Sequence, residues 1–320
     1  MTELPGATWR GRDGGTPRPV LDAPVAVPPR GPDGAAAAWG APSPRPTTPA
    51  LAAPPAWPTP VGARTERGRA LVVGVVGARG GAGASTFAAA LAARFARRTA
   101  TALVDLDRCS AGVDVLLALE DSDGVRWPDL TSARGDVDGA QVLALLPRWG
   151  PCAVLSADRH RPGLPDAGVL ADVLHALGGV CGVVVLDLER VGVVTGDSFA
   201  PVCDAVVVVA PRDLRSAAGL LALRGTLVAH GALVGLVTTG PSPGGLGSDE
   251  LAHAVDLPVL ARLGVDRRTA AATERGGVPL TGAVARAAAR VARAVVRDAP
   301  SPGSPVAVRD EPAAVVRGPW

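Results

Sequence analysis

Short apolar segments alternate with helix-sized stretches throughout residues 69–298, and this alternation constrains the fold more than any other feature of the sequence. The apolar segments predict strands at 70–76, 101–106, 152–157, 182–188, 204–210, 232–238 and 258–262. The stretches between them predict helices at 84–98, 112–119, 165–178, 213–229, 248–255, 266–275 and 281–297. Segments such as VVVLDL and AVVVVA are apolar at successive positions, as expected for strands buried on both faces. The sequence therefore predicts an α/β fold, with a doubly wound, mostly parallel sheet and helices on both faces.

Both ends of the chain differ from this central region in composition. Residues 1–68 contain 15 of the 31 prolines, and residues 299–320 are also rich in proline. Because proline lacks a backbone donor and fixes φ, neither a helical nor a strand period persists there. We predict disordered or polyproline-like segments on either side of one domain at 69–298. The first segment carries three tryptophans, candidate partner contacts although tail residues are more often incidental: Trp9, Trp39 and Trp57.

Charge and cysteine usage exclude several classes of protein. The net charge is +2, so no overall field favours nucleic acid or a membrane surface. The N-terminal residues lack the basic start and apolar run of a secretory signal, and no apolar run approaches the roughly 20 residues of a membrane span. The four cysteines and four histidines are widely spaced, which argues against disulfides and a zinc site. We therefore expect a cytoplasmic protein.

The first predicted strand runs directly into a glycine-rich turn and a helix. The turn contains four glycines, whose backbone amides can point at a phosphate: Gly77, Gly80, Gly81 and Gly83. The N-terminus of the following helix adds a partial positive charge. Ser85 lies where the hydroxyl of a phosphate-binding loop would hold Mg²⁺. These features predict a phosphate-binding loop at the end of the first strand.

The segment RGGAGAST (79–86) resembles the deviant Walker A loop of the MinD/ParA ATPases, K-G-G-x-G-K-[ST]-[ST]. LVDLDRCSAGVDVLLALE (103–120) is similar to the second motif of that family, and VVVLDLER (183–190) looks like its Walker B strand. The likeness continues in order through residues 69–297. Within the family, GARGGAGAST, VRWPDL and PGGLGSDEL most resemble the actinobacterial CpaE-like branch, which includes the septum-site-determining protein Ssd.

This resemblance implies roles for particular residues. It implies that ATP or ADP with Mg²⁺ binds at the loop, formed by Arg79, Gly80, Gly81, Ala82, Gly83, Ala84, Ser85 and Thr86. It implies that Mg²⁺ is held, directly or through water, by Ser85, Asp105 and Asp187. It further implies that Asp107 orients the attacking water in an active enzyme, and that Arg79 completes the site of a partner in a face-to-face homodimer.

Two lysines of the family loop are missing, since the chain contains arginine but no lysine. Arg79 keeps the charge of the first, whereas Ala84 deletes the charge that would hold the β- and γ-phosphates. A charge-assisted hydrogen bond contributes about 1.5–3 kcal/mol, so nucleotide binding should weaken by roughly one to two orders of magnitude. Hydrolysis should suffer more, because its transition state concentrates charge. The strand Asn that often reads adenine in this family is also missing, and LVTTG (236–240) stands in its place. We expect ATP hydrolysis to be weak or absent.

The resemblance implies a regulator of septum site selection that acts with division proteins, at the inner face of the plasma membrane or the septum when recruited there. One alternative is a CpaE-like localisation factor for a secretion or pilus-assembly ATPase, and others are an active ATPase switch and a nucleotide-free adaptor. The arginine-faced helix at 283–297 could lie on a membrane, and Arg262, Arg267 and Arg268 could contact DNA. We favour instead a helix packed on the domain and a solvated basic surface.

Overall fold

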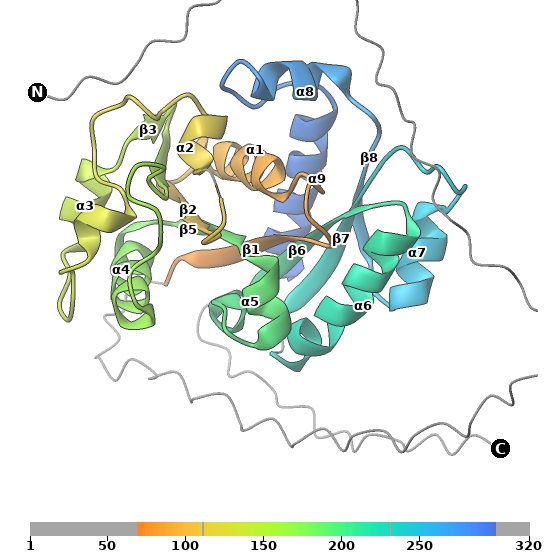
Figure 1. Ribbon diagram of the computed structural model, residues 1–320, viewed down its shortest axis with the longest axis horizontal. Helices are drawn as coiled ribbons and strands as arrows, with labels where there is room; N and C mark the ends of the chain where they lie inside the picture. Colours follow the sequence, from red (N-terminus) through yellow and green to blue (C-terminus); the bar gives the residue numbers. More distant parts are fainter. Residues whose placement is uncertain (1–68, 111, 231, 299–320) are drawn as a thin grey trace, which may run out of the picture. The chain divides into compact units, whose positions relative to one another are not determined.

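The computed structural model describes residues 69–110, 112–230 and 232–298; the predicted tails at 1–68 and 299–320 lie outside these residues. One sheet has the strand order β3-β4-β2-β5-β1-β6-β7-β8 (Figure 1). Its strands are β1 Leu71–Gly77, β2 Thr101–Leu106, β3 Arg148–Trp149, β4 Cys152–Leu155, β5 Val183–Leu188, β6 Ala205–Pro211, β7 Leu233–Thr239 and β8 Val259–Leu263. The helices are α1 Ala84–Ala96, α2 Val113–Leu116, α3 Gly139–Leu145, α4 Ala167–Val180, α5 Arg190–Thr195, α6 Leu214–Ala229, α7 Ser248–Val255, α8 Arg267–Thr273 and α9 Gly282–Asp298.

The predicted parallel sheet is confirmed. All seven predicted strands are present, and every neighbouring pair except β3 with β4 is parallel. The predicted helix at 112–119 is wrong in length, because α2 ends at Leu116 and the backbone then takes a positive φ at Ala118. Several short elements were not predicted from sequence: β3, α3, α5 and the short 3-10 helices at Trp127–Leu130 and Ala200–Val202.

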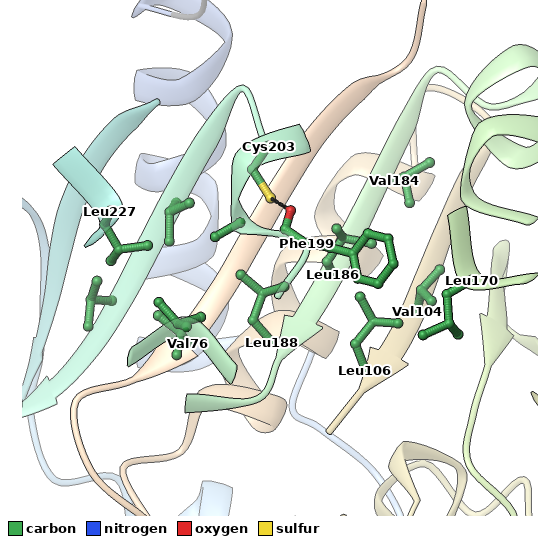
Figure 2. Close-up of a cluster of buried hydrophobic side chains, with 14 of the residues drawn as sticks. Val76, Val104, Leu106, Leu170, Val184, Leu186, Leu188, Phe199, Cys203 and Leu227 are labelled. Atoms are coloured by element: carbon green, nitrogen blue, oxygen red, sulfur yellow. Dashed lines mark hydrogen bonds between the residues drawn. The ribbon is translucent and has the colours of Figure 1, made fainter. Parts of the chain in front are cut away.

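The sheet is buried on both faces. Along β5, Val183 and Val185 pack in the core beneath α1 and α9, whereas Val184 and Leu186 pack in the core beneath α4 and α6. Figure 2 shows the second core, in which side chains from neighbouring strands meet Leu170 of α4. The strand segments are therefore continuously apolar because both faces of the sheet are buried, as predicted.

The last helix packs on the domain, as the sequence analysis favoured. Six side chains of α9 are buried against α1 and β8: Val284, Ala287, Ala288, Val291, Ala292 and Val295. The arginines at 286, 290, 293 and 297 lie on the exposed face. The apolar face of this helix is thus already covered. None of the helices in the described part of the chain is both long enough and apolar enough to cross a bilayer.

Candidate functional site

The predicted phosphate loop occupies residues 78–83, between β1 and α1 at the centre of the sheet. Gly81 and Gly83 have φ values of 69° and 90°, in the left-handed region that favours glycine. A Cβ atom placed on Gly80, Gly81 or Gly83 would have no neighbour within 4 Å. The loop surface is therefore open, and a ligand can approach the backbone closely.

The loop amides are free to bind an anion. Within the described residues, none of the amides of 79–83 donates a hydrogen bond. Gly83 is the N-cap of α1 and supplies no side-chain cap, and the first turn of this 13-residue helix contains no acidic residue. Unsatisfied amides at a helix N-terminus attract negative charge. This arrangement fits a phosphate group.

Arg79 is held by its own chain. Its Nε and Nη2 donate to Oδ2 of Asp213 at 3.3 and 3.0 Å, and its Nη1 donates to the carbonyl oxygen of Gly80 at 3.1 Å. Asp213 is also the N-cap of α6, accepting from the amide of Ser216 at 2.8 Å. That amide and Arg79 hold the pKa of Asp213 below its usual value. To complete a partner's site, Arg79 would have to leave this ion pair.

Two buried carboxyl groups lie beside the loop, at the ends of neighbouring strands. Asp105 of β2 and Asp187 of β5 are register partners, and they are 0% and 2% exposed. Both oxygens of Asp105 accept backbone amides, from Asp107 at 3.1 Å and from Val113 at 3.0 Å. Asp187 interacts with the hydroxyl of Ser85, but its Oδ2 has no hydrogen-bond partner among the described residues. Asp187 is therefore the incompletely satisfied member of the pair.

Burial and mutual repulsion disfavour the charged forms of both groups. Burial raises the pKa of Asp105 to about 6. Burial and the charge of Asp105 raise the pKa of Asp187 to about 8, although the Ser85 hydroxyl opposes this. Carboxylate and hydroxyl oxygens are ligands that Mg²⁺ accepts, and a divalent cation would neutralise the pair. The three residues Ser85, Asp105 and Asp187 thus fit the implied ion.

We predict that, in magnesium-free buffer, the stability of Asp187→Asn relative to wild type increases as the pH rises. The folded-state pKa of Asp187 is raised, so its ionisation opposes folding from about pH 4 up to the folded pKa near 8. Between pH 6.5 and 7.5 the variant should gain at most about 1.4 kcal/mol relative to wild type. Urea unfolding at both pH values measures this gain, and Mg²⁺ should stabilise the wild type more than the variant, which lacks one of the three proposed ion ligands. An equal pH response of the two proteins would contradict the prediction.

Asp107 lies outside this buried pair. Its Oδ1 accepts the amide of Cys109 at 2.9 Å, and it is half-buried. Asp107, Cys109 and Glu189 each bring one ligand atom to within 4.8 Å of the others. Neither Cys109 nor Glu189 was predicted as a site residue from the sequence. Oε2 of Glu189 lies 3.5 Å from Nε of Arg108, so the negative charge of this cluster is partly neutralised.

The carboxyl end of β2 is supported by a buried network that the sequence analysis missed. Nε1 of Trp127 donates to the carbonyl oxygen of Asp105 at 2.6 Å. Arg126 donates through Nε to Asp114 at 3.0 Å, and the hydroxyl of Ser156 donates to the same carboxylate at 3.0 Å. Arg126 and Trp127 belong to the VRWPDL segment, whose sequence alone predicts no structural role for either residue. The network holds Asp105 in place beside the loop.

Polar groups at the end of β7, where the family's adenine-reading Asn is missing, are also hydrogen-bonded within the chain. The hydroxyls of Thr238 and Ser248 lie 2.8 Å apart in a buried hydrogen bond. The amide of Gly240 donates to Leu263 at 3.0 Å, and Nη2 of Arg212 lies near Gly240. The Thr238 hydroxyl therefore has a partner within the chain.

Comparisons with known proteins give two kinds of relative. No protein-family model matches the chain. The uncharacterized proteins MT3760 and Rv3660c of Mycobacterium tuberculosis (strains CDC 1551 / Oshkosh and ATCC 25618 / H37Rv) are each 41% identical to it over 211 residues. These residues make up 65% of this chain, which spans 59% of the length of either relative.

Solved structures share the fold at low identity. A chain of the MinC:MinD cell division protein complex of Aquifex aeolicus has a TM-score of 0.58 at 15% identity, covering 72% of this chain and 98% of that one. MinD of Pyrococcus horikoshii, complexed with Mg-ADP, has a TM-score of 0.55 at 16% identity, covering 71% and 96%. A ParA family ATPase of Chlorobium tepidum has a TM-score of 0.53 at 16% identity, covering 72% and 97%. The described chain therefore has the fold of the MinD/ParA P-loop ATPases.

Proposed function

We propose that this chain is a nucleotide-responsive P-loop protein that binds Mg-ATP or Mg-ADP weakly and hydrolyses ATP slowly or not at all. The observation that carries the proposal is the open, uncapped amide loop beside a buried carboxylate oxygen of Asp187 that lacks a partner. An anion site and a cation site so close together match the two charges of a magnesium–phosphate ligand.

In this proposal each group of site residues has a separate role. The amides of residues 80–84 bind the phosphate oxygens, and Ser85, Asp105 and Asp187 hold Mg²⁺ directly or through water. Bound Mg²⁺ would supply positive charge at the phosphates, where Ala84 supplies none. Asp107 would orient a water molecule if hydrolysis occurs. Arg79 would complete the site of a second copy after leaving Asp213.

We further propose that the protein regulates septum site selection as a homodimer that acts with division proteins. Two observations support this role. The motifs resemble the septum-site-determining branch of the family, and the solved relatives include cell division proteins named MinD. Co-purification of the full chain with division proteins would support it, whereas co-purification with a secretion or pilus-assembly ATPase would favour the localisation factor.

Calorimetry on the full chain tests nucleotide binding. We expect weak, magnesium-dependent heat with both ATP and ADP. Ser85→Ala removes a proposed ion ligand. The affinity of this variant for nucleotide should therefore be severalfold lower than that of wild type in Mg²⁺ and about the same in EDTA. The matched control, Ser132→Ala, removes an exposed hydroxyl outside the proposed site and should leave the affinity unchanged. No heat from wild type at millimolar nucleotide would overturn the proposal and leave the nucleotide-free adaptor.

A further inference from the structure

A cavity of about 280 Å³ opens on the face of the sheet opposite α1. Its apolar floor consists of Leu106, Leu170, Leu188 and Phe199, whose side chains converge in Figure 2. Its rim includes the first turn of α4 and the polar side chains Arg108, Glu189 and Asp197. None of the residues proposed to hold phosphate or Mg²⁺ lines it.

The cavity lies between two segments that leave the phosphate site. Arg108 follows Asp107 and bonds to Asp197 at 3.0 Å and to Glu189 at 3.5 Å, so it bridges the segments after β2 and β5. Those segments begin directly after the strands that carry Asp105 and Asp187. An occupant of the cavity would therefore contact both at once.

The chain upstream of the described domain starts close enough to reach the cavity. Arg69 donates to the carbonyl oxygen of Val202 at 2.8 Å, three residues after Phe199 in the cavity wall. Val202 lies near the amino ends of the strands and the cavity near their carboxyl ends. The six residues of β5 separate these two ends by about 20 Å. Trp57 lies twelve residues before Arg69, a span of up to about 40 Å.

We propose that Trp57, which lies outside the described residues, docks its indole ring in this cavity. An apolar cavity of about 150 Å³ holds benzene, so 280 Å³ accommodates a bicyclic ring. The floor offers apolar contacts, and the polar rim offers acceptors for the indole N–H. The rim sets two carboxylates, Glu189 and Asp197, against the single cation of Arg108, and residues 64–67, with two arginines and one glutamate, complement this net negative charge. The N-terminal segment would thereby contact both segments that leave the phosphate site. The proposal does not depend on nucleotide binding.

Fluorine NMR of the full chain, labelled with 5-fluorotryptophan and free of nucleotide, tests the proposal. The chain has six tryptophans, and Trp57→Phe identifies the resonance of interest. We expect a soluble gadolinium chelate to broaden the Trp57 signal severalfold less than the signal of Trp39, which is assigned in the same way. Equal broadening of the two signals would overturn the proposal.

A pair of variants then locates the docking site. Ala167→Phe fills the cavity from an exposed position in the first turn of α4, so the floor and the fold should remain intact. It should expose Trp57 to the chelate. Ala222→Phe adds the same ring at an exposed position on α6, away from the cavity, and should leave Trp57 protected. If Trp57 stays protected in Ala167→Phe, it docks elsewhere and the assignment of this cavity is wrong.

Discussion

Replacing Ala84 by lysine is expected to tighten binding of Mg-ATP by about 10- to 100-fold. Ala84 is the first residue of α1 and is half-buried, directly after the open glycine loop. A charge-assisted hydrogen bond from the introduced ammonium to a phosphate oxygen contributes about 1.5–3 kcal/mol. The same charge would also offset the repulsion among Asp105, Asp107 and Asp187. Calorimetry on the full chain measures the change.

A neutral side chain of similar length separates charge from added contact area. Ala84→Met should bind Mg-ATP about as weakly as wild type, because it adds no cation. The affinity for ADP should increase less than that for ATP in Ala84→Lys. The lysine of the resembled loop is expected to contact both the β- and γ-phosphates, and ADP lacks the γ-phosphate. An Ala84→Lys variant that binds no better than wild type would show that the loop has lost more than one contact.

The sheet could be predicted from sequence because its strands are buried on both faces. Apart from Asp187 near its end, VVVLDL is apolar at every position, as expected for a strand buried on both faces. The shorter elements depend on long-range packing instead. β3 contains only two residues and pairs with β4 across a turn at Gly150, whose φ is 57°. α3 has seven residues and packs against α4, and no local period of that length distinguishes it from a loop.

Some features of the candidate site could also be predicted from sequence, and others could not. The glycines of the loop and the carboxyl groups at strand ends follow one another in sequence order, so their motif could be recognised locally. The ion pair of Arg79 with Asp213 joins positions 134 residues apart, and nothing local to Arg79 points to it. Similarly, Ser156 meets Asp114 across 42 residues. A charged residue such as Arg126 is normally exposed, so its burial follows only from the folded structure.

Arg126→Met is expected to destabilise the fold by about 3–5 kcal/mol, the usual cost of breaking a buried ion pair from one side. The side chains of Arg126 and Asp114 are each 7% exposed and meet at 3.0 Å. The guanidinium also donates to the carbonyl oxygens of Leu119 at 2.7 Å and Gly124 at 3.2 Å. Methionine fills similar volume but leaves these acceptors and the Asp114 charge unpaired. Chemical denaturation of the full chain measures the loss.

The double variant Arg126→Met with Asp114→Asn shows how much of that loss comes from the stranded charge. Asparagine can still accept from the Ser156 hydroxyl, which lies 3.0 Å from Oδ1 of Asp114, but it carries no charge. Because the two residues are in contact, the double variant should lose less stability than the sum of the single variants. Arg161→Met is the matched control, since its ion pairs with Asp129 and Asp158 are exposed and should contribute less than about 1 kcal/mol. A loss in Arg126→Met no larger than in Arg161→Met would show that the buried network does not hold the end of β2.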